Sequence, residues 1–183
     1  SPTDVATTGG GVSVTGIYFG REGKAEPFML SSDGSSTLLP YDVSILEYDS
    51  VNQNSMKVNI SPGQGLAKLA LNVSGNVAEM DLPYRRPQLD APSGGQIIMN
   101  TEGGNNVTLT GSNFGIGVDY SIEVREGAGG TDSNFPAKIE YPTNLIHHFT
   151  HTGLEFVIPE GQNTRDDPMQ LVLKVANQES EPI

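Results

Sequence analysis

Two stretches of the sequence recur in the same order, and this internal repeat limits the possible fold more than any other feature. Residues 10–20 (GGVSVTGIYFG) resemble residues 104–115 (GNNVTLTGSNFG), and Gly16 and Gly111 stand 95 positions apart. A second pair, residues 69–76 and 171–178, follows at a spacing of 102 positions, so the second copy has about seven additional residues (102 − 95) between its landmarks. Ordered landmarks at nearly one period predict a tandem duplication in which each copy is one structural unit.

The hydrophobic pattern of both landmarks predicts β-strands. Val or Leu alternates with Ser or Thr in residues 12–15 and 107–110, and residues 68–73 alternate in the same way, with Lys68, Ala70 and Asn72 expected on the exposed face. A period of two residues is typical of a strand with one buried and one exposed face. Because sustained helical periodicity free of Gly and Pro is missing, further strands are predicted over 27–30, 43–48, 55–60, 97–99, 120–125, 138–141 and 154–158.

The abundance of turn-forming residues agrees with many short strands. The chain has 22 Gly and 12 Pro among 183 residues, and β-sandwich domains commonly contain about 100 residues. The sequence therefore predicts an all-β chain of two tandem immunoglobulin-like β-sandwich domains, residues 1–88 and 89–183. At the corner after the first strand of each copy, glycine is expected to supply a positive φ, and Phe19 and Phe114 are expected to place their rings in the end of the sandwich.

These corners carry a resemblance to a known family. Residues 15–20 (TGIYFG) and 110–115 (TGSNFG) resemble the opening strand and turn of plexin-type immunoglobulin-like domains, the IPT/TIG family. The family's Gly-Gly pair, its turn with proline and glycine, and its aromatic–x–x–Pro linker are matched by residues 9–10 and 94–95, by Pro62 and Pro159, and by residues 84–89. The resemblance covers nearly the whole chain, although the family's frequent cysteines are missing. It implies a fold and not an activity, because sandwiches of this kind have many functions.

Composition excludes several classes of function. The chain has no cysteine, which rules out disulfides, a thiol nucleophile and a Cys-based zinc site. A formal net charge of −12 with only ten Lys and Arg argues against a nucleic-acid partner. No stretch approaches the roughly 20 apolar residues of a membrane span, and the sequence does not open with a basic-then-apolar signal segment.

The histidines are the first candidate for chemistry. His147, His148 and His151 are the three histidines of the chain, and paired histidines can bind zinc. In a strand, however, His147 and Phe149 would share one face and His148 the other, so we favour a surface strand or loop over a metal site.

Oxygen-rich loops and catalytic motifs give no stronger signal. Asp166 and Asp167, with Asn163 and Thr164, could bind calcium, but the spaced acidic pattern of a calcium loop is missing and a solvated turn is favoured. Neither a nucleophile elbow nor a phosphate loop nor a dinucleotide loop is found. We therefore predict no enzyme activity, no cofactor and no metal.

Three N-glycosylation sequons are present, at Asn59, Asn72 and Asn106. Strand parity places all three side chains outward, and Pro62 after Ser61 makes Asn59 the poorest acceptor. The sequence predicts N-linked glycans at these positions in a secreted protein, and the alternative is an ordinary polar strand face.

The chain ends suggest an assembly. Residues 181–183 (EPI) stand where the first copy has residues 86–89, and joining the end to the beginning resembles the linker at 87–95. We expect one unit of a longer array or end-to-end self-association, with truncation at a domain boundary as the alternative. The predicted function is a structural glycoprotein module of an extracellular or cell-surface fibre or matrix.

Two other functions stay open. The chain could be an adhesion or receptor ectodomain that binds protein or glycan through a patch formed by residues 84–86 with Tyr18, or through residues 143–152. A carbohydrate-binding accessory domain is less favoured, because the chain has no Trp.

Overall fold

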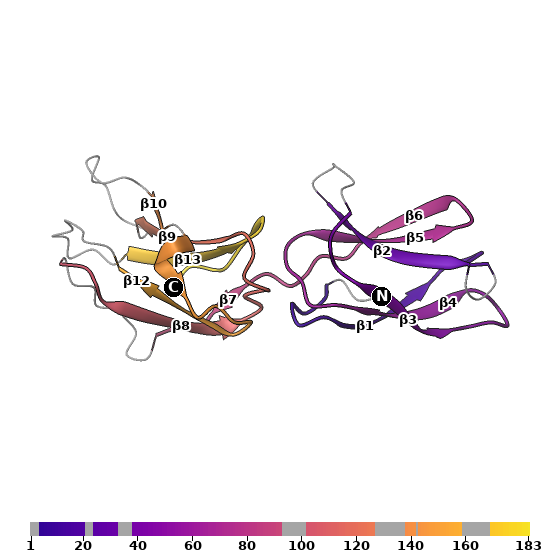
Figure 1. Ribbon diagram of the computed structural model, residues 1–183, viewed down its shortest axis with the longest axis horizontal. Coiled ribbons are helices and arrows are strands. Elements are labelled where there is room, and N and C mark those ends of the chain that lie inside the picture. The colour runs from indigo at the N-terminus through magenta and orange to yellow at the C-terminus, as the bar shows by residue number, and fades with distance from the viewer. Residues whose placement is uncertain are drawn as a thin grey trace. The chain divides into compact units, whose positions relative to one another are not determined.

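The computed structural model describes residues 4–20, 24–32, 38–92, 102–126, 138–141, 143–158 and 169–183 (Figure 1). The chain divides into two compact units, unit 1 (Ser1–Arg85) and unit 2 (Arg86–Ile183). Apart from one 3₁₀ turn, η1 (Thr143–Leu145), the regular structure of the described residues consists of antiparallel β-sheets. In each unit the two sheets form separate layers (Figure 1).

Unit 1 contains two three-stranded sheets, in the orders β1-β4-β3 and β2-β5-β6. Their strands are β1 (Gly10–Thr15), β2 (Ala25–Ser31), β3 (Val43–Tyr48), β4 (Ser55–Ile60), β5 (Ala67–Val73) and β6 (Asn76–Asp81).

Unit 2 contains two four-stranded sheets, in the orders β11-β12-β8-β7 and β10-β9-β13-β14. Their strands are β7 (Gln88–Leu89), β8 (Asn106–Ser112), β9 (Tyr120–Glu126), β10 (Lys138–Tyr141), β11 (Ile146–His147), β12 (Gly153–Val157), β13 (Met169–Val175) and β14 (Gln178–Glu179).

The strand order is that of an immunoglobulin-type sandwich. In the letters used for immunoglobulin domains, strands β7 to β14 of unit 2 are A, B, C, C′, D, E, F and G in chain order, and its sheets have the orders A-B-E-D and C′-C-F-G. Strands β1 to β6 of unit 1 are B, C, D, E, F and G, and its sheets have the orders B-E-D and C-F-G. The all-β, immunoglobulin-like prediction is therefore confirmed. The strands β3, β4 and β10 have the predicted bounds, whereas β6, β7, β11 and β14 were not predicted, and residues 97–99 lie outside the described residues.

Each unit has its own hydrophobic core between its two sheets. In unit 1 the cluster includes Val58 of β4 and Leu69 of β5, and in unit 2 it includes Phe156 of β12 and Leu173 of β13. The prediction that Ala70 lies on an exposed face is wrong, because Ala70 is fully buried. It lies in the central strand of its sheet between the longer side chains of its register partners, Phe28 and Glu79.

The first landmark forms the same corner in both units. The Gly16 N–H donates to Asn54 O (2.9 Å), and the Gly111 N–H donates to Thr152 O (3.0 Å). The rings predicted to enter the sandwich, Phe19 and Phe114, are both buried, as expected. Backbone conformation agrees as well, since Tyr18 (φ 63°) and Asn113 (φ 59°) are equivalent non-glycine residues with positive φ.

Glycine has two different roles in this corner. Gly20 (φ 77°) and Gly115 (φ 87°) supply the predicted left-handed conformation. Gly16 instead makes room for the ring of Phe19, since a Cβ added there would lie 2.8 Å from Cε1 of that ring. Gly111 makes room for Phe114 in the same way. The first glycine of each corner is thus needed for close packing.

The second landmark also forms equivalent structure. It ends in the β5–β6 turn of unit 1 and the β13–β14 turn of unit 2, where Ser74 (φ 53°) and Ala176 (φ 52°) stand 102 positions apart. The repeat found in the sequence is therefore a repeat of backbone geometry.

The predicted equivalence of residues 181–183 with residues 86–89 is wrong. The Leu171 N–H donates to Ile183 O (2.9 Å), and the Ile183 N–H donates to Leu171 O (3.1 Å). Ile183 also packs against the core of unit 2. These residues therefore lie beside β13 beyond the end of β14, because backbone hydrogen bonds and apolar packing hold them there.

Candidate functional site

The chain passes from unit 1 to unit 2 through a very short segment. The Arg85 N–H donates to Val5 O (2.7 Å), and the Arg85 side chain pairs with Asp4 (2.9 Å), so Arg85 is bound to unit 1. Strand β7 begins at Gln88 and pairs with β8 of unit 2. Only Arg86 and Pro87 lie between these two anchored residues, and the Arg86 guanidinium pairs with Glu181 at 2.7 Å. The segment thus contains no free linker.

Tyr84 fixes the end of unit 1 from which this segment leaves. Its side chain is 1% exposed, and its hydroxyl donates to Ser61 O (2.9 Å). Its ring meets that of Tyr41 edge to face at 5.3 Å. Burial, with Tyr41 nearby, raises the pKa of the Tyr84 hydroxyl. The prediction that Tyr84 contributes to a surface patch is therefore wrong, because its neighbours Ser61 and Gly63 and the Tyr41 ring cover it.

Apolar side chains are exposed at the corner of unit 1. Ile17 is 76% exposed, Tyr18 86% and Val51 84%. The corner is tied to the loop that carries Val51, because the Phe19 N–H donates to Gln53 O (3.2 Å). We call these three residues (Ile17, Tyr18 and Val51) the apolar tip.

The loop of the apolar tip has a defined conformation. The Asp49 carboxylate accepts hydrogen bonds from the backbone N–H groups of Val51 (3.1 Å) and Asn52 (3.0 Å). The bonds from Asn52, backbone first, lower the pKa of Asp49. The position of Val51 is therefore set by an Asx-type turn.

The three sequon asparagines lie in different surroundings. Asn59 on β4 and Asn106 at the start of β8 are exposed. Asn72 is half-buried, donates through Nδ2 to Glu26 (3.3 Å) and accepts from the Gly75 N–H (3.0 Å). An attached glycan would replace one of the two Nδ2 hydrogens and would have to fit beside Glu26.

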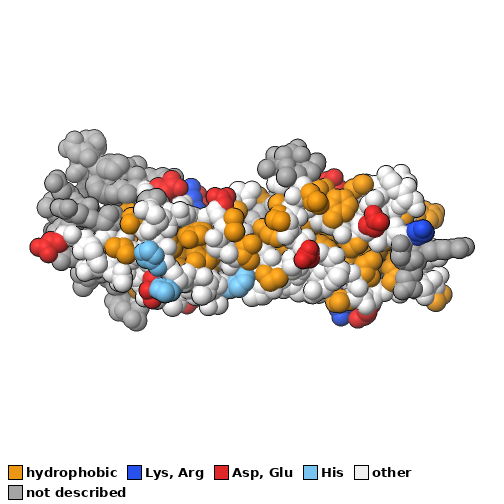
Figure 2. All heavy atoms as spheres, in the orientation of Figure 1, with side chains coloured by type: hydrophobic (Ala, Val, Ile, Leu, Met, Phe, Trp, Pro, Cys, Tyr) orange, Lys and Arg blue, Asp and Glu red, His pale blue; other side chains and the backbone are white. Residues whose placement is uncertain are grey.

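The histidines lie along the chain between η1 and β12. His147 is in β11, His148 has a positive φ of 51°, and the His151 carbonyl accepts from the Phe114 N–H (3.0 Å). The backbone of this segment thus supports the corner of unit 2. In Figure 2 the histidine side chains lie at separate places on the visible face, and among the described residues no group of His, Asp and Glu is arranged to hold a metal ion. Asp166 and Asp167 lie outside the described residues.

A buried carboxylate lies on the sheet of β9 and β13. Glu123 is 0% exposed and accepts from Arg125 Nε (2.9 Å) and Nη2 (2.7 Å), and Lys174 Nζ stands 2.5 Å from its other oxygen. Both cations also pair with Glu179. The bonds to Glu123 and Glu179 raise the pKa values of Arg125 and Lys174, and the bonds from these cations lower the pKa of Glu179. No pattern in the sequence indicates this network, because its members meet only after β9, β13 and β14 pair.

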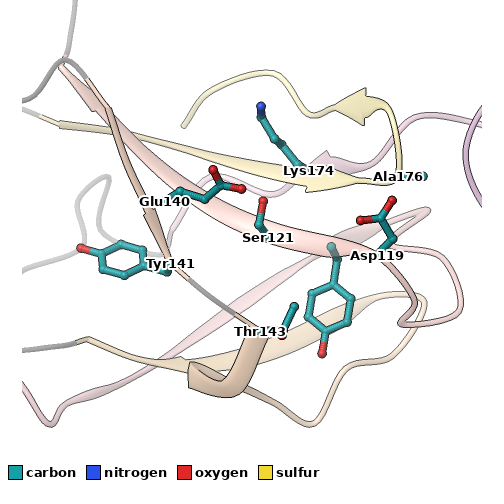
Figure 3. A pocket seen from close by; sticks show the side chains of 8 residues that line it. Asp119, Ser121, Glu140, Tyr141, Thr143, Lys174 and Ala176 are labelled. Carbon is teal, nitrogen blue, oxygen red and sulfur yellow. The ribbon is translucent and has the colours of Figure 1, made fainter.

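A cleft of about 530 Å³ lies beside this network and shares Lys174 with it. Figure 3 shows Glu140 pointing toward Ser121 and the Tyr141 ring pointing away from the other labelled side chains. Its lining includes no histidine, and its cation, Lys174, is already paired with two carboxylates. This arrangement offers polar contacts, but its lining does not form a nucleophile–base–orienting set. The lining residues are Asp119, Tyr120, Ser121, Glu140, Tyr141, Thr143, Lys174 and Ala176.

The described part of the chain holds no helix with the length and hydrophobicity that a membrane crossing requires. No family's sequence profile matches the chain. No curated protein matches it either.

Solved structures with partial similarity contain tandem domains. Domains A168-A170 from titin share 12% identity over 98% of this chain and 60% of that chain, with a TM-score of 0.32. Extracellular domains 3-5 of Drosophila OTK share 14% identity over 97% of this chain and 57% of that chain, with a TM-score of 0.30. A chimeric titin Z1Z2 functionalized with a KLER exogenous peptide from decorin shares 15% identity over 97% of this chain and 89% of that chain, with a TM-score of 0.27. The immunoglobulin-like fold is assigned from the strand order of the two units and not from these low TM-scores.

Proposed function

We propose that this chain is a structural module of an extracellular or cell-surface assembly, in which units of the IPT/TIG kind follow one another in an array or filament. The observation that carries the proposal is the short connection between the units. Only Arg86 and Pro87 separate Arg85, bound to unit 1, from Gln88, paired in unit 2. A proline in a connection without free residues limits bending, which suits a spacer or a fibre.

Surface chemistry supports an extracellular place for the module. The net charge of −12 favours solubility and spacing, and the exposed Asn59 and Asn106 are open to glycan. Mass measurement of the secreted chain before and after glycosidase treatment tests this part. We expect glycosidase treatment to lower the mass of the chain, and the loss should be smaller in the Asn106→Gln variant. Asn72→Gln is the comparison, because Asn72 is half-buried and hydrogen-bonded and its replacement should change the loss less. An unchanged mass would remove glycosylation from the proposal.

The array itself is tested by imaging and by solution mass. Electron micrographs of the natural protein should show filaments with a regular axial repeat, and light scattering should show a mass that grows with concentration. A chain that stays monomeric at all concentrations and gives no ordered filament contradicts the proposal.

The second candidate is an adhesion or receptor ectodomain. The apolar tip favours it, because exposed aromatic and aliphatic side chains are typical of contact surfaces. Residues 143–152 of the histidine-containing segment offer a second surface. Binding of the isolated chain on a glycan array, abolished by Tyr18→Ser, would favour this function over the array.

A further inference from the structure

The first strand of unit 1 has an open edge where the equivalent strand of unit 2 is covered. Strand β1 is the outer strand of the sheet β1-β4-β3, whereas its counterpart β8 lies between β12 and β7. Strand β7 pairs Gln88 with Ser112 and Leu89 with Gly111. With the repeat spacing of 95, the residues of unit 1 at these places are Ile17 and Gly16. Within the described residues, no strand pairs with this side of β1.

The backbone of this edge is oriented to accept a strand. The Gly16 N–H donates to Asn54 O on the β4 side, so the backbone groups of Thr15 and Ile17 face the opposite side. The same parity holds in unit 2, where the Thr110 carbonyl accepts from the Asp90 N–H at 2.9 Å. An unpaired row of N–H and C=O groups is a template for strand addition.

Exposure differs between the two edges in the direction that a missing strand predicts. Gly16, Ile17 and Tyr18 are exposed, whereas residues 111–113 of unit 2 are half-buried. The core position next to the edge behaves in the same way, since Val14 is half-buried and its counterpart Leu109 is buried.

The chemistry of the edge indicates an apolar occupant. Unit 2 has the polar Ser112 and Asn113 where unit 1 has Ile17 and Tyr18. An aliphatic and an aromatic side chain at an open edge gain more from being covered than polar ones do.

We propose that the edge of β1 at residues 15–17 receives an extended segment of a second copy of the repeat, which adds to β1 as β7 adds to β8. The segment has the chemistry of residues 86–90, in which Pro87 is buried and Leu89 packs against the core of its unit. The apolar tip lies beside this edge and is covered by the incoming copy. The inference rests on the proposed array and names the contact through which one copy joins the next.

The test adds a copy of residues 84–95 in front of Ser1 in the full chain. Because the repeat spacing is 95, the added copy precedes unit 1 as the original precedes unit 2. Amide hydrogen exchange is then followed by NMR. We expect the Ile17 amide to exchange at least about tenfold more slowly than in the parent chain, while the Ser112 amide, already paired with β7, stays unchanged and serves as the internal reference. A control carries Leu89→Asp and Gln88→Pro in the added copy and should leave Ile17 exchange as in the parent chain.

A free peptide of residues 84–95 gives a second readout on the unmodified chain. At millimolar peptide, the amide resonances of Thr15 and Ile17 should shift, and Ile17→Asp should remove the effect. Unchanged Ile17 exchange in the extended chain together with absent peptide shifts overturns the proposal. Filaments of the parent chain, combined with unchanged Ile17 exchange in the extended chain and absent peptide shifts, would leave the array intact and exclude this contact. A protected Ile17 amide in the extended chain, combined with a parent chain that forms no filament, would keep the receiving edge and exclude the array.

Discussion

Replacing Gly111 with alanine separates the packing role of this glycine from a conformational one. Gly111 is not among the positive-φ residues, so alanine is compatible with its backbone. A methyl group there would overlap the carbonyl oxygen of Gln88 and would stand 2.8 Å from Cε1 of Phe114. The overlapping atom on the β7 side belongs to the backbone, which cannot turn aside as a flexible side chain can. Strand β7 must therefore move off β8.

The expected cost follows from what β7 contributes. Its ladder bonds and the bond from the Asp90 N–H to Thr110 O are each worth about 0.5–1.5 kcal/mol net. The half-buried Leu89 adds about 1 kcal/mol of apolar burial. We expect Gly111→Ala to lower the free energy of unfolding of unit 2 by about 2–4 kcal/mol.

Two matched variants test the reasoning. At Gly16 the three atoms nearest to the added methyl all belong to the Phe19 ring, the first of them Cε1 at 2.8 Å, so Gly16→Ala should cost unit 1 about 1–2 kcal/mol. At Gly11 it meets the flexible end of Lys57, 3.3 Å from Cε, and stands in ordinary contact with Cδ1 of Leu46 at 4.0 Å, so Gly11→Ala should stay within about 0.5 kcal/mol of the parent chain.

Native-state hydrogen exchange of the full chain is the appropriate assay, because it reports each unit separately where one global unfolding curve would not. Gly111→Ala should also release the Ser112 amide. If Gly111→Ala unfolds like Gly11→Ala and keeps Ser112 protected, the steric explanation of this glycine is refuted.

Three further outcomes are expected. Tyr84→Phe loses the hydroxyl bond to Ser61 O and should destabilise unit 1 by about 0.5–1.5 kcal/mol in urea unfolding; equal stability would show that this bond contributes nothing. Lys174→Met removes one cation from the buried Glu123 and should destabilise unit 2 by about 1–3 kcal/mol, more than Glu179→Gln, whose exposed carboxylate should cost less than about 1 kcal/mol. Since its cationic partners lower the pKa of Glu179 below 4.5, its contribution is complete above that pH and is lost as the pH falls through the folded value. The midpoint temperature of thermal unfolding should therefore fall less steeply from pH 6 to pH 2 for Glu179→Gln than for the parent chain. Profiles that run parallel for the two proteins would count against this pairing.

Much of the fold could be predicted because strand patterns are local. The bounds of β3, β4 and β10 followed from alternation and neighbouring turns. The two-residue strands β7, β11 and β14 are too short to show a period, and they exist because a longer partner strand holds them. Ala70 was wrongly predicted to be exposed for a related reason, since alternation assigns a residue to a face of the sheet but does not reveal which side chains on adjacent strands cover it.

The candidate sites depended even more on tertiary contacts. Tyr84 has the sequence surroundings of a surface linker residue, yet the Ser61 carbonyl and the Tyr41 ring bury it. Ile183 has the sequence surroundings of a linker, yet Leu171 holds it beside β13. These partners are more than ten positions away, where no pattern in a single sequence can identify them.

The sequence by itself determined the duplication, the strand class and the corner with its buried phenylalanine, because these depend on residue types a few positions apart. Only the tertiary structure decided that Gly111 makes room for a neighbouring strand, that Glu123 is buried between two cations, and that the edge of β1 is open where that of β8 is covered. Each of these depends on which strand lies beside which, and the pairing is set by long-range backbone bonds and core packing rather than by the local pattern.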